Sequence, residues 1–203
     1  MKPQIIEKLA EIFSLFPGIG RRQASRFAYW LADCDKLFID DLKSALNGLR
    51  QMKRCPFCFR IHVGQDFCSL CSDDSRDHSK IAIVEKDTDL EAMERAGIYR
   101  GRYLILGGLL STLDSKSRDK IRLKEIFHRV KNDQAIKEII LALSATVEAE
   151  FSAHYVEKIL EPITLKRKIN ITRLGRGLST GAEIEYLNKE TLKNALENRK
   201  PYL

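Results

Sequence analysis

The stretch from Ile81 to Gly108, "IAIVEKDTDLEAMERAGIYRGRYLILGG", decides the fold of the larger part of this 203-residue chain. Two β-rich runs enclose the amphipathic segment "DLEAMERAG", and further β-rich runs follow as "EIILAL" (138–143) and "KINITRL" (168–174), each after a helix-like segment. Strands that alternate with helices of this length predict a parallel sheet with crossover helices. The sequence therefore predicts an α/β domain over residues 80–175.

The N-terminal segment, residues 1–53, is predicted to hold three helices, one up to Leu15, one from about Gln23 to Leu31 and one from about Ile39 to Met52. The first two are separated by "FPGIGRRQA" (16–24). Proline and glycine end a helix, and Gly18 and Gly20 let another backbone approach closely. The next helix then begins with unpaired N–H groups, with Arg21 and Arg22 at its positive end. We interpret the pattern as a helix-hairpin-helix whose glycines and arginines contact DNA phosphates. An ordinary αα-hairpin, whose glycines only make the turn, is the alternative.

The aromatic side chains of the second predicted helix are interpreted as core rather than as stacking platforms: Phe27, Tyr29 and Trp30.

Four cysteines make residues 54–72 a separate module. Cys55 and Cys58, and then Cys68 and Cys71, form two C-x2-C pairs with nine residues between them. Paired turns of this kind deliver four thiolates to tetrahedral zinc, and four protein ligands leave no open position, so the predicted zinc is structural. A disulfide is the weaker alternative, because export signals are not evident. The fifth cysteine, Cys34, is interpreted as an ordinary thiol.

Three basic side chains flank the module: Lys53, Arg54 and Arg60. We expect them either to contact DNA or simply to face solvent. The segment "SDDSRDHSK" (72–80) is predicted to be a polar linker. Residues 176–203 complete the chain, with glycine-punctuated turns and a last helix that begins after Asn188.

Charge and composition narrow the class of protein. The net charge is +7, and residues 1–60 hold eleven Lys and Arg against six Asp and Glu, so five of the seven excess charges lie there. A basic end predicts a polyanionic partner such as nucleic acid, although a merely soluble basic protein would also fit. A hydrophobic share of 44% argues against disorder. No segment is typical of a membrane span or an export signal, so we expect a cytoplasmic protein.

Acidic residues follow two of the predicted strands. Glu85 ends the first strand, and Glu148 and Glu150 open the helix after the third. Ligands of parallel sheets collect beyond the carboxyl ends of the strands, and converging carboxylates could hold Mg²⁺. Acids at helix starts are also favoured by the helix dipole alone, which leaves that alternative open. In "LGRGLSTGAE" (174–183) we expect turns, with Arg173 and Arg176 available for anions.

Taken together, these motifs resemble the bacterial recombination mediator family RecR along essentially the whole chain. The resemblance rests on "FPGIGRRQASRFA", the four cysteines, "IVEKDTDLEAMERAGIYRGRYLILGGLLSTLD", "TVEAEFSAHYV" and "GLSTGAEIEYLNKETL". It implies a helix-hairpin-helix, a zinc module, a Toprim-like domain and a C-terminal oligomerisation region, in that order.

The resemblance implies a function in recombinational DNA repair of gaps. Family members help RecO, and in many bacteria RecF, to load RecA onto single strands coated by the single-strand-binding protein, and they assemble into dimers and ring-shaped tetramers. It also implies that Gly18, Gly20, Arg21 and Arg22 contact DNA. The family's Toprim acids correspond to Glu85, Glu148 and Glu150. The resemblance implies that they serve partner binding more than chemistry, so no catalytic residue is expected.

Some positions depart from the family pattern, and most lie in loops around the Toprim acids: Thr112, Ser144, Ala145, Ala149, Ser179 and Asn188.

The alternative to a mediator is a Mg²⁺-dependent Toprim nuclease or topoisomerase-like enzyme, which the three acids would suggest. That class usually has Asp-x-Asp after the third strand, where this chain has Glu148-Ala149-Glu150. A protein-interaction hub with incidental DNA contact is the third hypothesis.

Overall fold

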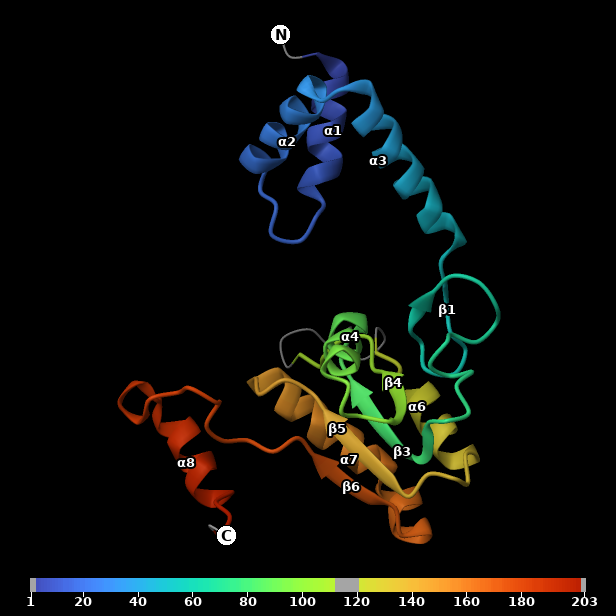
Figure 1. The fold of residues 1–203 in the computed structure, drawn as a ribbon, viewed down its shortest axis with the longest axis vertical. Coiled ribbons are helices and arrows are strands. Elements are labelled where there is room, and N and C mark those ends of the chain that lie inside the picture. The colour runs from blue at the N-terminus through green and yellow to red at the C-terminus, as the bar shows by residue number, and fades with distance from the viewer. Residues whose placement is uncertain (1–2, 112–120, 202–203) are drawn as a thin grey trace. The chain divides into compact units, whose positions relative to one another are not determined.

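The computed structural model describes residues 3–111 and 121–201 and separates into two compact units, Met1–Met52 and Lys53–Leu203 (Figure 1). Among the described residues, none of the helices combines the length and the apolar character needed to cross a membrane.

The first unit consists of helices: α1 (Gln4–Ser14), α2 (Arg21–Asp33), α3 (Lys36–Gly48) and a short 3-10 turn, η1 (Leu49–Gln51) (Figure 1). α1 and α2 pack against each other, and the small side chains of Ala24 and Ala28 are fully buried there. These two alanines are four residues apart, so they lie on one face of α2 and allow the close approach of α1.

The prediction that the α2 aromatics are core is wrong for two of the three. Tyr29 is 45% exposed and Trp30 is 56% exposed, whereas Phe27 is half-buried with its ring centroid 6.1 Å from that of Phe13. The physical reason is helical geometry, because Ala24 and Ala28 occupy the face toward α1 and leave positions 29 and 30 outside it.

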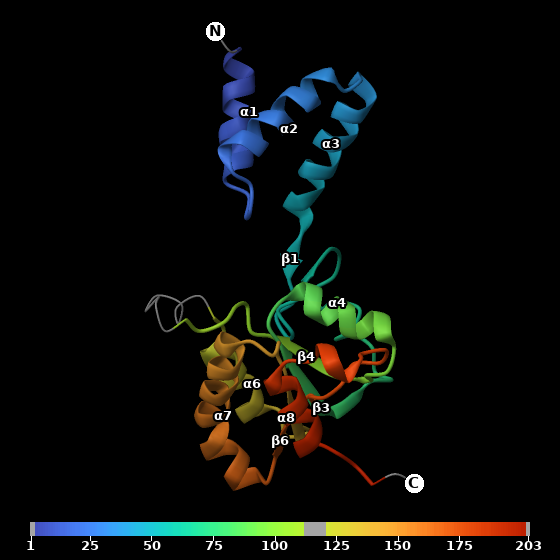
Figure 2. The same ribbon diagram turned by 90° about the vertical axis from the view of Figure 1, so that its left-hand side faces the viewer.

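The second unit begins with the cysteine module and continues as an α/β domain (Figures 1 and 2). The module holds an antiparallel pair, β1 (Lys53–Arg54) and β2 (Ile61–His62). The larger sheet has four parallel strands in the order β4-β3-β5-β6. Its elements are β3 (Asp77–Val84), α4 (Asp87–Ala96), β4 (Gly101–Ile105), α6 (Leu123–Asn132), β5 (Glu138–Ala142), α7 (Val147–Arg167) and β6 (Asn170–Arg173). The predicted mixed α/β class with a parallel sheet is confirmed.

Two apolar layers cover the sheet, because alternate residues of a strand face opposite sides. On one face, Ile81, Ile83 and their neighbours pack against α6 and α7 through buried residues such as Ile126 and Leu160. On the other face, Ala82 and Val84 pack with Leu90 of α4. Figure 2 shows α6 and α7 on the side of the sheet opposite α4. Because β3 is central and buried on both faces, the loop after it is held in a defined place.

The predicted linker over residues 72–80 needs correction, because β3 already begins at Asp77. The backbone N–H of Asp77 donates to the carbonyl of Arg100 at 2.8 Å, which starts the pairing with β4. Arg76, also in the expected linker, is only 8% exposed. The segment lacks an apolar period because its partners are polar, and so local pattern alone could not identify it as a strand.

The chain ends with a 3-10 turn, η2 (Ile184–Tyr186), and helix α8 (Lys189–Glu197). Asn188 caps α8 as predicted, since its side-chain oxygen accepts from the backbone N–H of Thr191 at 2.8 Å.

Candidate functional site

The four predicted metal-ligand cysteines lie together. Their sulfur atoms are all within 4.8 Å of one another, and Cys58 Sγ lies 3.5 Å from Cys68 Sγ. Tetrahedral zinc with metal–sulfur bonds of about 2.3 Å separates its sulfurs by roughly 3.8 Å, so the cluster has the size that such an ion needs. Cys55, Cys58 and Cys68 are buried and Cys71 is half-buried. The group could therefore hold a metal ion.

Tight turns bring each pair of cysteines together. In the first pair, the Phe59 N–H donates to the Cys55 carbonyl at 2.9 Å, with Phe59 in the left-handed region at φ 66°. In the second, the Cys71 N–H donates to the Cys68 carbonyl at 3.0 Å. These turns point the side chains of each pair toward a common centre, which is what a C-x2-C spacing predicts.

The crowded thiols shift one another's acidity. The hydrogen bond with Cys68 and then burial raise the pKa of the Cys58 thiol, and contacts with Cys58 and Cys68 raise the pKa of Cys71. The hydrogen bonds from Cys58 and Cys71 lower the pKa of Cys68. A metal that binds four thiolates must displace the protons of the thiols, so metal affinity should rise with pH.

The basic residues around the module have separate environments. Arg54 donates to the Phe59 carbonyl at 2.8 Å and lies 3.5 Å from a carboxylate oxygen of Asp87, so it is engaged within the fold. The Nε atom of Arg60 is buried. Lys53 lies 3.4 Å from Asp66 on an exposed surface. Arg54 thus has a structural role that the sequence left undecided.

The hairpin turn lies between α1 and α2, where the glycine break predicts it, but Gly20 has φ −81° and ψ 164°, which residues other than glycine also adopt. Gly18 has φ 78°, a conformation that favours glycine, and Gly20 precedes the first residue of α2. Arg21 and Arg22 open α2, both exposed, and no acidic side chain of the described residues forms an ion pair with them. Gly20 offers no side-chain cap to the first N–H groups of α2. This end of the helix therefore combines positive charge with free backbone donors.

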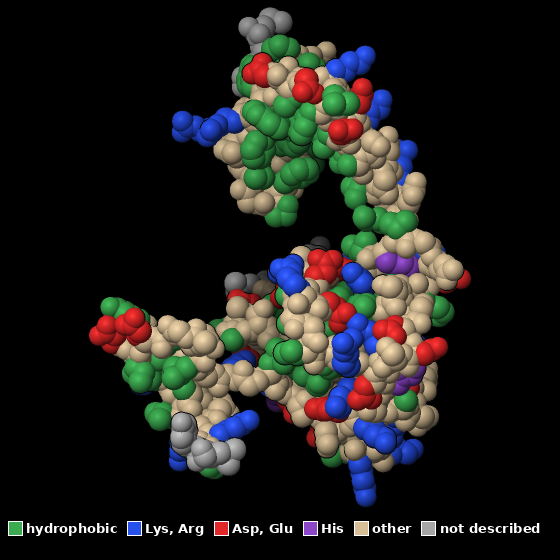
Figure 3. All heavy atoms as spheres, viewed as in Figure 1, with side chains coloured by type: hydrophobic (Ala, Val, Ile, Leu, Met, Phe, Trp, Pro, Cys, Tyr) green, Lys and Arg blue, Asp and Glu red, His purple; other side chains and the backbone are tan. Residues whose placement is uncertain are grey.

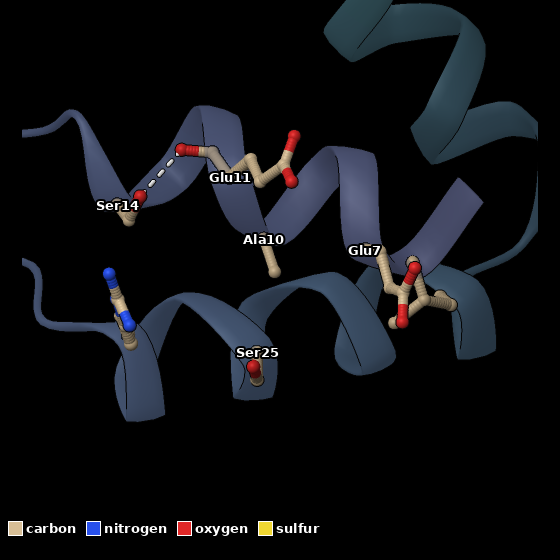
Figure 4. A pocket seen from close by; sticks show the side chains of 7 residues that line it. Glu7, Ala10, Glu11, Ser14 and Ser25 are labelled. Atoms are coloured by element: carbon tan, nitrogen blue, oxygen red, sulfur yellow. Dashed lines mark hydrogen bonds between the residues drawn. The ribbon is translucent and has the colours of Figure 1, made fainter. Parts of the chain in front are cut away.

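A groove of about 580 Å³ runs between α1 and α2 beside this hairpin (Figure 4). Figure 4 shows Ala10 of α1 pointing toward α2, with Ser14 donating from its hydroxyl to the Glu11 carbonyl at 2.7 Å. Apolar side chains gather on the face of this unit seen in Figure 3. The exposed large apolar side chains of the unit include Ile5, Ile12 and Phe16.

The acidic residues after β3 and β5 have different environments. Glu85 is half-buried directly after β3, and its carbonyl accepts from the Gly107 N–H at 2.8 Å. Glu148 is exposed in the first turn of α7. Glu150 is half-buried in the same turn. Within residues 3–111 and 121–201, the only group of three or more potential ligands gathered closely enough for a metal is the cysteine cluster.

Glu150 is held by two arginines, which the sequence analysis left available for anions. Arg173 donates to one carboxylate oxygen at 2.9 Å, and Arg176 donates to the other. The carbonyl of Arg176 in turn accepts from the Asn198 side chain at 3.1 Å, next to the end of α8. Glu150 therefore fastens the segment that leads into the C-terminal region, and Glu85 and Glu148 have no comparable clamp among the described side chains.

Sequence reasoning also missed a polar cluster beneath α4. The Arg76 guanidinium donates to the Glu94 carboxylate at 3.0 Å and to the Gly101 carbonyl at 3.0 Å. The Tyr103 hydroxyl donates to Glu94 at 2.7 Å. Burial raises the pKa of Glu94, but the hydrogen bonds from Arg76 and Tyr103 outweigh it, so its pKa is lowered overall. No local motif marks these residues, because they are separated along the chain.

The sequence of this chain is similar to those of known proteins. Residues 79–175 match the Toprim domain family, and residues 177–200 match the family described as RecR, C-terminal. The "Recombination protein RecR" of Lactobacillus acidophilus is 36% identical over 97% of each chain. The chain belongs to the RecR family. The RecR proteins of Lactobacillus delbrueckii subsp. bulgaricus and Brachyspira hyodysenteriae are each 38% identical, over 97% of this chain and 97% or 96% of theirs.

Membership of the RecR family makes this a recombination protein, as the sequence resemblance implied. Among the positions that we expect to depart from the RecR pattern, Ala149 is fully buried, whereas Ser144, Ala145 and Ser179 are exposed. Thr112 lies outside the described residues. The buried alanine fits without breaking α7, since its N–H is capped by the Thr146 hydroxyl at 3.3 Å.

Proposed function

We propose that this chain is a DNA-binding recombination mediator that performs no covalent chemistry. In this proposal it assists RecO and, where present, RecF in loading RecA onto single-stranded gaps coated by the single-strand-binding protein. The observation that carries the DNA-binding part is the start of α2, where exposed Arg21 and Arg22 adjoin the uncapped backbone at Gly20. Phosphates bind such sites, whatever the base sequence.

The DNA contact is tested by the salt dependence of binding to a gapped duplex. On duplex DNA, each phosphate that the protein neutralises contributes about 0.9 to the slope of log K against log salt. The double variant Arg21→Ala with Arg22→Ala should therefore reduce the slope by roughly 1.8. The matched control is Lys36→Ala with Lys43→Ala, which removes the same charge from exposed positions of α3. Equal slopes for both double variants would overturn the proposed hairpin contact.

The absence of chemistry is part of the proposal and needs its own test. Labelled gapped DNA is incubated with the protein and Mg²⁺, and each sample is run on native and denaturing gels. A shifted complex with intact DNA supports a mediator. Cleavage that disappears in Glu85→Gln would instead support a Toprim enzyme. The clamp on Glu150 by Arg173 and Arg176 supports the mediator, since both oxygens that a catalytic metal ion would need are paired with guanidinium groups.

We further propose zinc as the ion of Cys55, Cys58, Cys68 and Cys71, with a structural role. The buried thiols and their spacing support it, because four protein sulfurs complete a tetrahedral shell. The proposed division of the chain is residues 1–53 for DNA, 54–72 for zinc, 80–175 for the Toprim-like domain and 176–203 for oligomerisation. Elemental analysis of protein purified without added metal tests the ion, with one zinc per chain expected.

Partner binding and assembly complete the proposal. We assign RecO and RecF binding to the acidic edge at Glu85, Glu148 and Glu150, and dimer and ring-shaped tetramer formation to the two ends of the chain. Exposed apolar side chains at the C-terminal end, Ile184, Tyr186 and Leu196, support a role in assembly, because burying their surface against a second chain is favourable. Light scattering of the full chain and of Tyr186→Ser measures that assembly.

A further inference from the structure

One main-chain hydrogen bond joins a metal-ligand residue of the cysteine module to the sheet. The Ile105 N–H, at the end of β4, donates to the Cys58 carbonyl at 2.9 Å. The next residue, Phe59, packs its ring against both apolar layers of the sheet. The turn at residues 55–59 therefore connects the module to the carboxyl end of β4 and to both apolar layers.

A second connection ends on a single side chain, Asp87. One of its carboxylate oxygens accepts from the Ile61 N–H of β2 at 2.7 Å, and the other lies 3.5 Å from the Arg54 guanidinium of β1. Asp87 is the first residue of α4 and is only two residues beyond Glu85. A carboxylate that accepts an N–H bond and faces a guanidinium makes hydrogen bonds of the stronger, charge-assisted kind.

Asp87 thus faces the module, although it stands among the acids at the edge of the sheet. Its neighbour Asp89 lies in the same turn, but Asp89 accepts from the Lys86 N–H at 3.3 Å and so caps its own helix. Asp87 binds across to the module, whereas Asp89 binds within its own helix. Asp87 is therefore the attachment point of the first turn of α4 to the module.

We propose that Asp87 is a positioning residue that couples metal occupancy of the cysteine module to the loop carrying Glu85. Residues 54–61 keep the shape that Asp87 binds only while the metal holds Cys55 and Cys58. Coupling between two sites is reciprocal, so breaking the Asp87 contact must weaken the metal site by the same factor by which metal loss loosens Asp87. This inference rests on the proposed metal at the four cysteines and not on the proposed DNA or partner roles.

The test measures metal release from the full-length zinc-loaded protein into excess EDTA, followed by the metal content retained on the chain over time. Asp87→Ala should release zinc about tenfold faster than the natural protein, the scale of one missing charge-assisted hydrogen bond, and Asp87→Asn should lie between them. The matched control is Asp89→Asn, which changes an acid in the same turn and should release zinc at the natural rate. Arg54→Ala removes the module's side of the same contact. It keeps the test decisive should Asp87→Ala fail to fold.

Amide hydrogen exchange measures the other direction of the coupling, the effect of zinc on residues 85–90. Zinc removal should speed exchange of the amides of residues 85–90 in the natural protein more than in Asp87→Ala, with the interior of α7 as the reference segment. Unchanged zinc release in both Asp87 variants and in Arg54→Ala, or equal exchange with and without zinc at residues 85–90, would overturn the coupling alone. Natural protein that holds no metal would overturn the proposed metal site together with this inference.

Discussion

The cysteine module and the helical hairpin are both short segments with little apolar core. The polar groups of the module face inward, and those of the hairpin face solvent. In the module, three of the four thiols are buried and Arg54 is engaged with Phe59 and Asp87. In the hairpin, Arg21 and Arg22 are exposed and the start of α2 has no side-chain cap. The difference separates groups that hold the fold from groups that are free to bind something else.

The comparison has an energetic consequence. Polar groups turned inward stabilise the fold only while all their partners are present, because a buried group without a partner costs free energy. Exposed cations at the positive end of a helix do not stabilise that helix. Substitutions in the module should therefore lower the free energy of unfolding strongly, and substitutions of the exposed hairpin arginines should change it little while they change binding.

The largest effect is expected from Cys58→Ser. Structural zinc sites contribute roughly 10–16 kcal/mol in small fingers, so loss of one ligand should reduce the free energy of unfolding by about 5 kcal/mol or more. Zinc content and thermal unfolding of the variant measure it. Cys34→Ser is the control, because Cys34 lies outside the cluster and its thiol donates to the Trp30 carbonyl. Similar losses for both cysteines would remove the distinction between module and hairpin unit.

A smaller loss is expected from Glu94→Gln, which tests an inward-facing polar cluster that contains no metal ligand. Arg76 would keep its charge at 8% exposure but lose its carboxylate, at a cost of about 2–3 kcal/mol at neutral pH. Chemical unfolding of the variant beside the natural protein measures this loss.

The same cluster predicts a pH dependence with a definite sign. The pKa of Glu94 is lowered in the folded protein, so the unfolded chain binds the proton more tightly. The stability that Glu94 contributes is therefore present above its ordinary pKa of 4.5 and is lost as the pH falls through the folded value. Glu94→Gln should flatten the acid side of the stability curve. If the stability of Glu94→Gln and that of the natural protein fall equally steeply as the pH is lowered, this assignment is wrong.

Gly18→Ala should have a moderate effect on stability. A β-carbon at Gly18 would meet no atom within 4 Å, so the cost comes from its φ of 78° alone and should be about 1 kcal/mol. Gly48→Ala is the matched control, since Gly48 also has open space but a helical φ of −59°. It should stabilise by about 0.5 kcal/mol. Chemical unfolding of both variants decides whether the hairpin turn needs its left-handed residue.

The smallest effect, and of opposite sign, is expected for the stability of Arg21→Ala with Arg22→Ala. Removing two exposed cations from the positive end of α2 should raise the free energy of unfolding by about 0.5 kcal/mol at low salt. Added salt should cancel the difference through screening. Clear destabilisation by the double variant would mean that these arginines hold the fold, and the contrast with the module would disappear.

Several features could be predicted from the sequence because they depend on residues close together in the chain. The turn at Gly18 needs only a local backbone conformation, and the paired cysteines need only short spacings. Alternation of strands and helices also repeats locally, so the parallel sheet was predictable. The exposure of Tyr29 and Trp30 was not, because it depends on which face of α2 meets α1.

The sequence by itself determined the four thiols, the glycine break before Arg21, the acids after the strands and the α/β class. The tertiary structure alone decided which of these groups are occupied within the fold. It directs Asp87 to Ile61 and Glu150 to Arg173, and it draws Arg76 beneath α4 from a segment that looks like a linker. The reason is that ion pairs and hydrogen bonds join residues distant in the chain, and their partners are set only when the sheet brings them together.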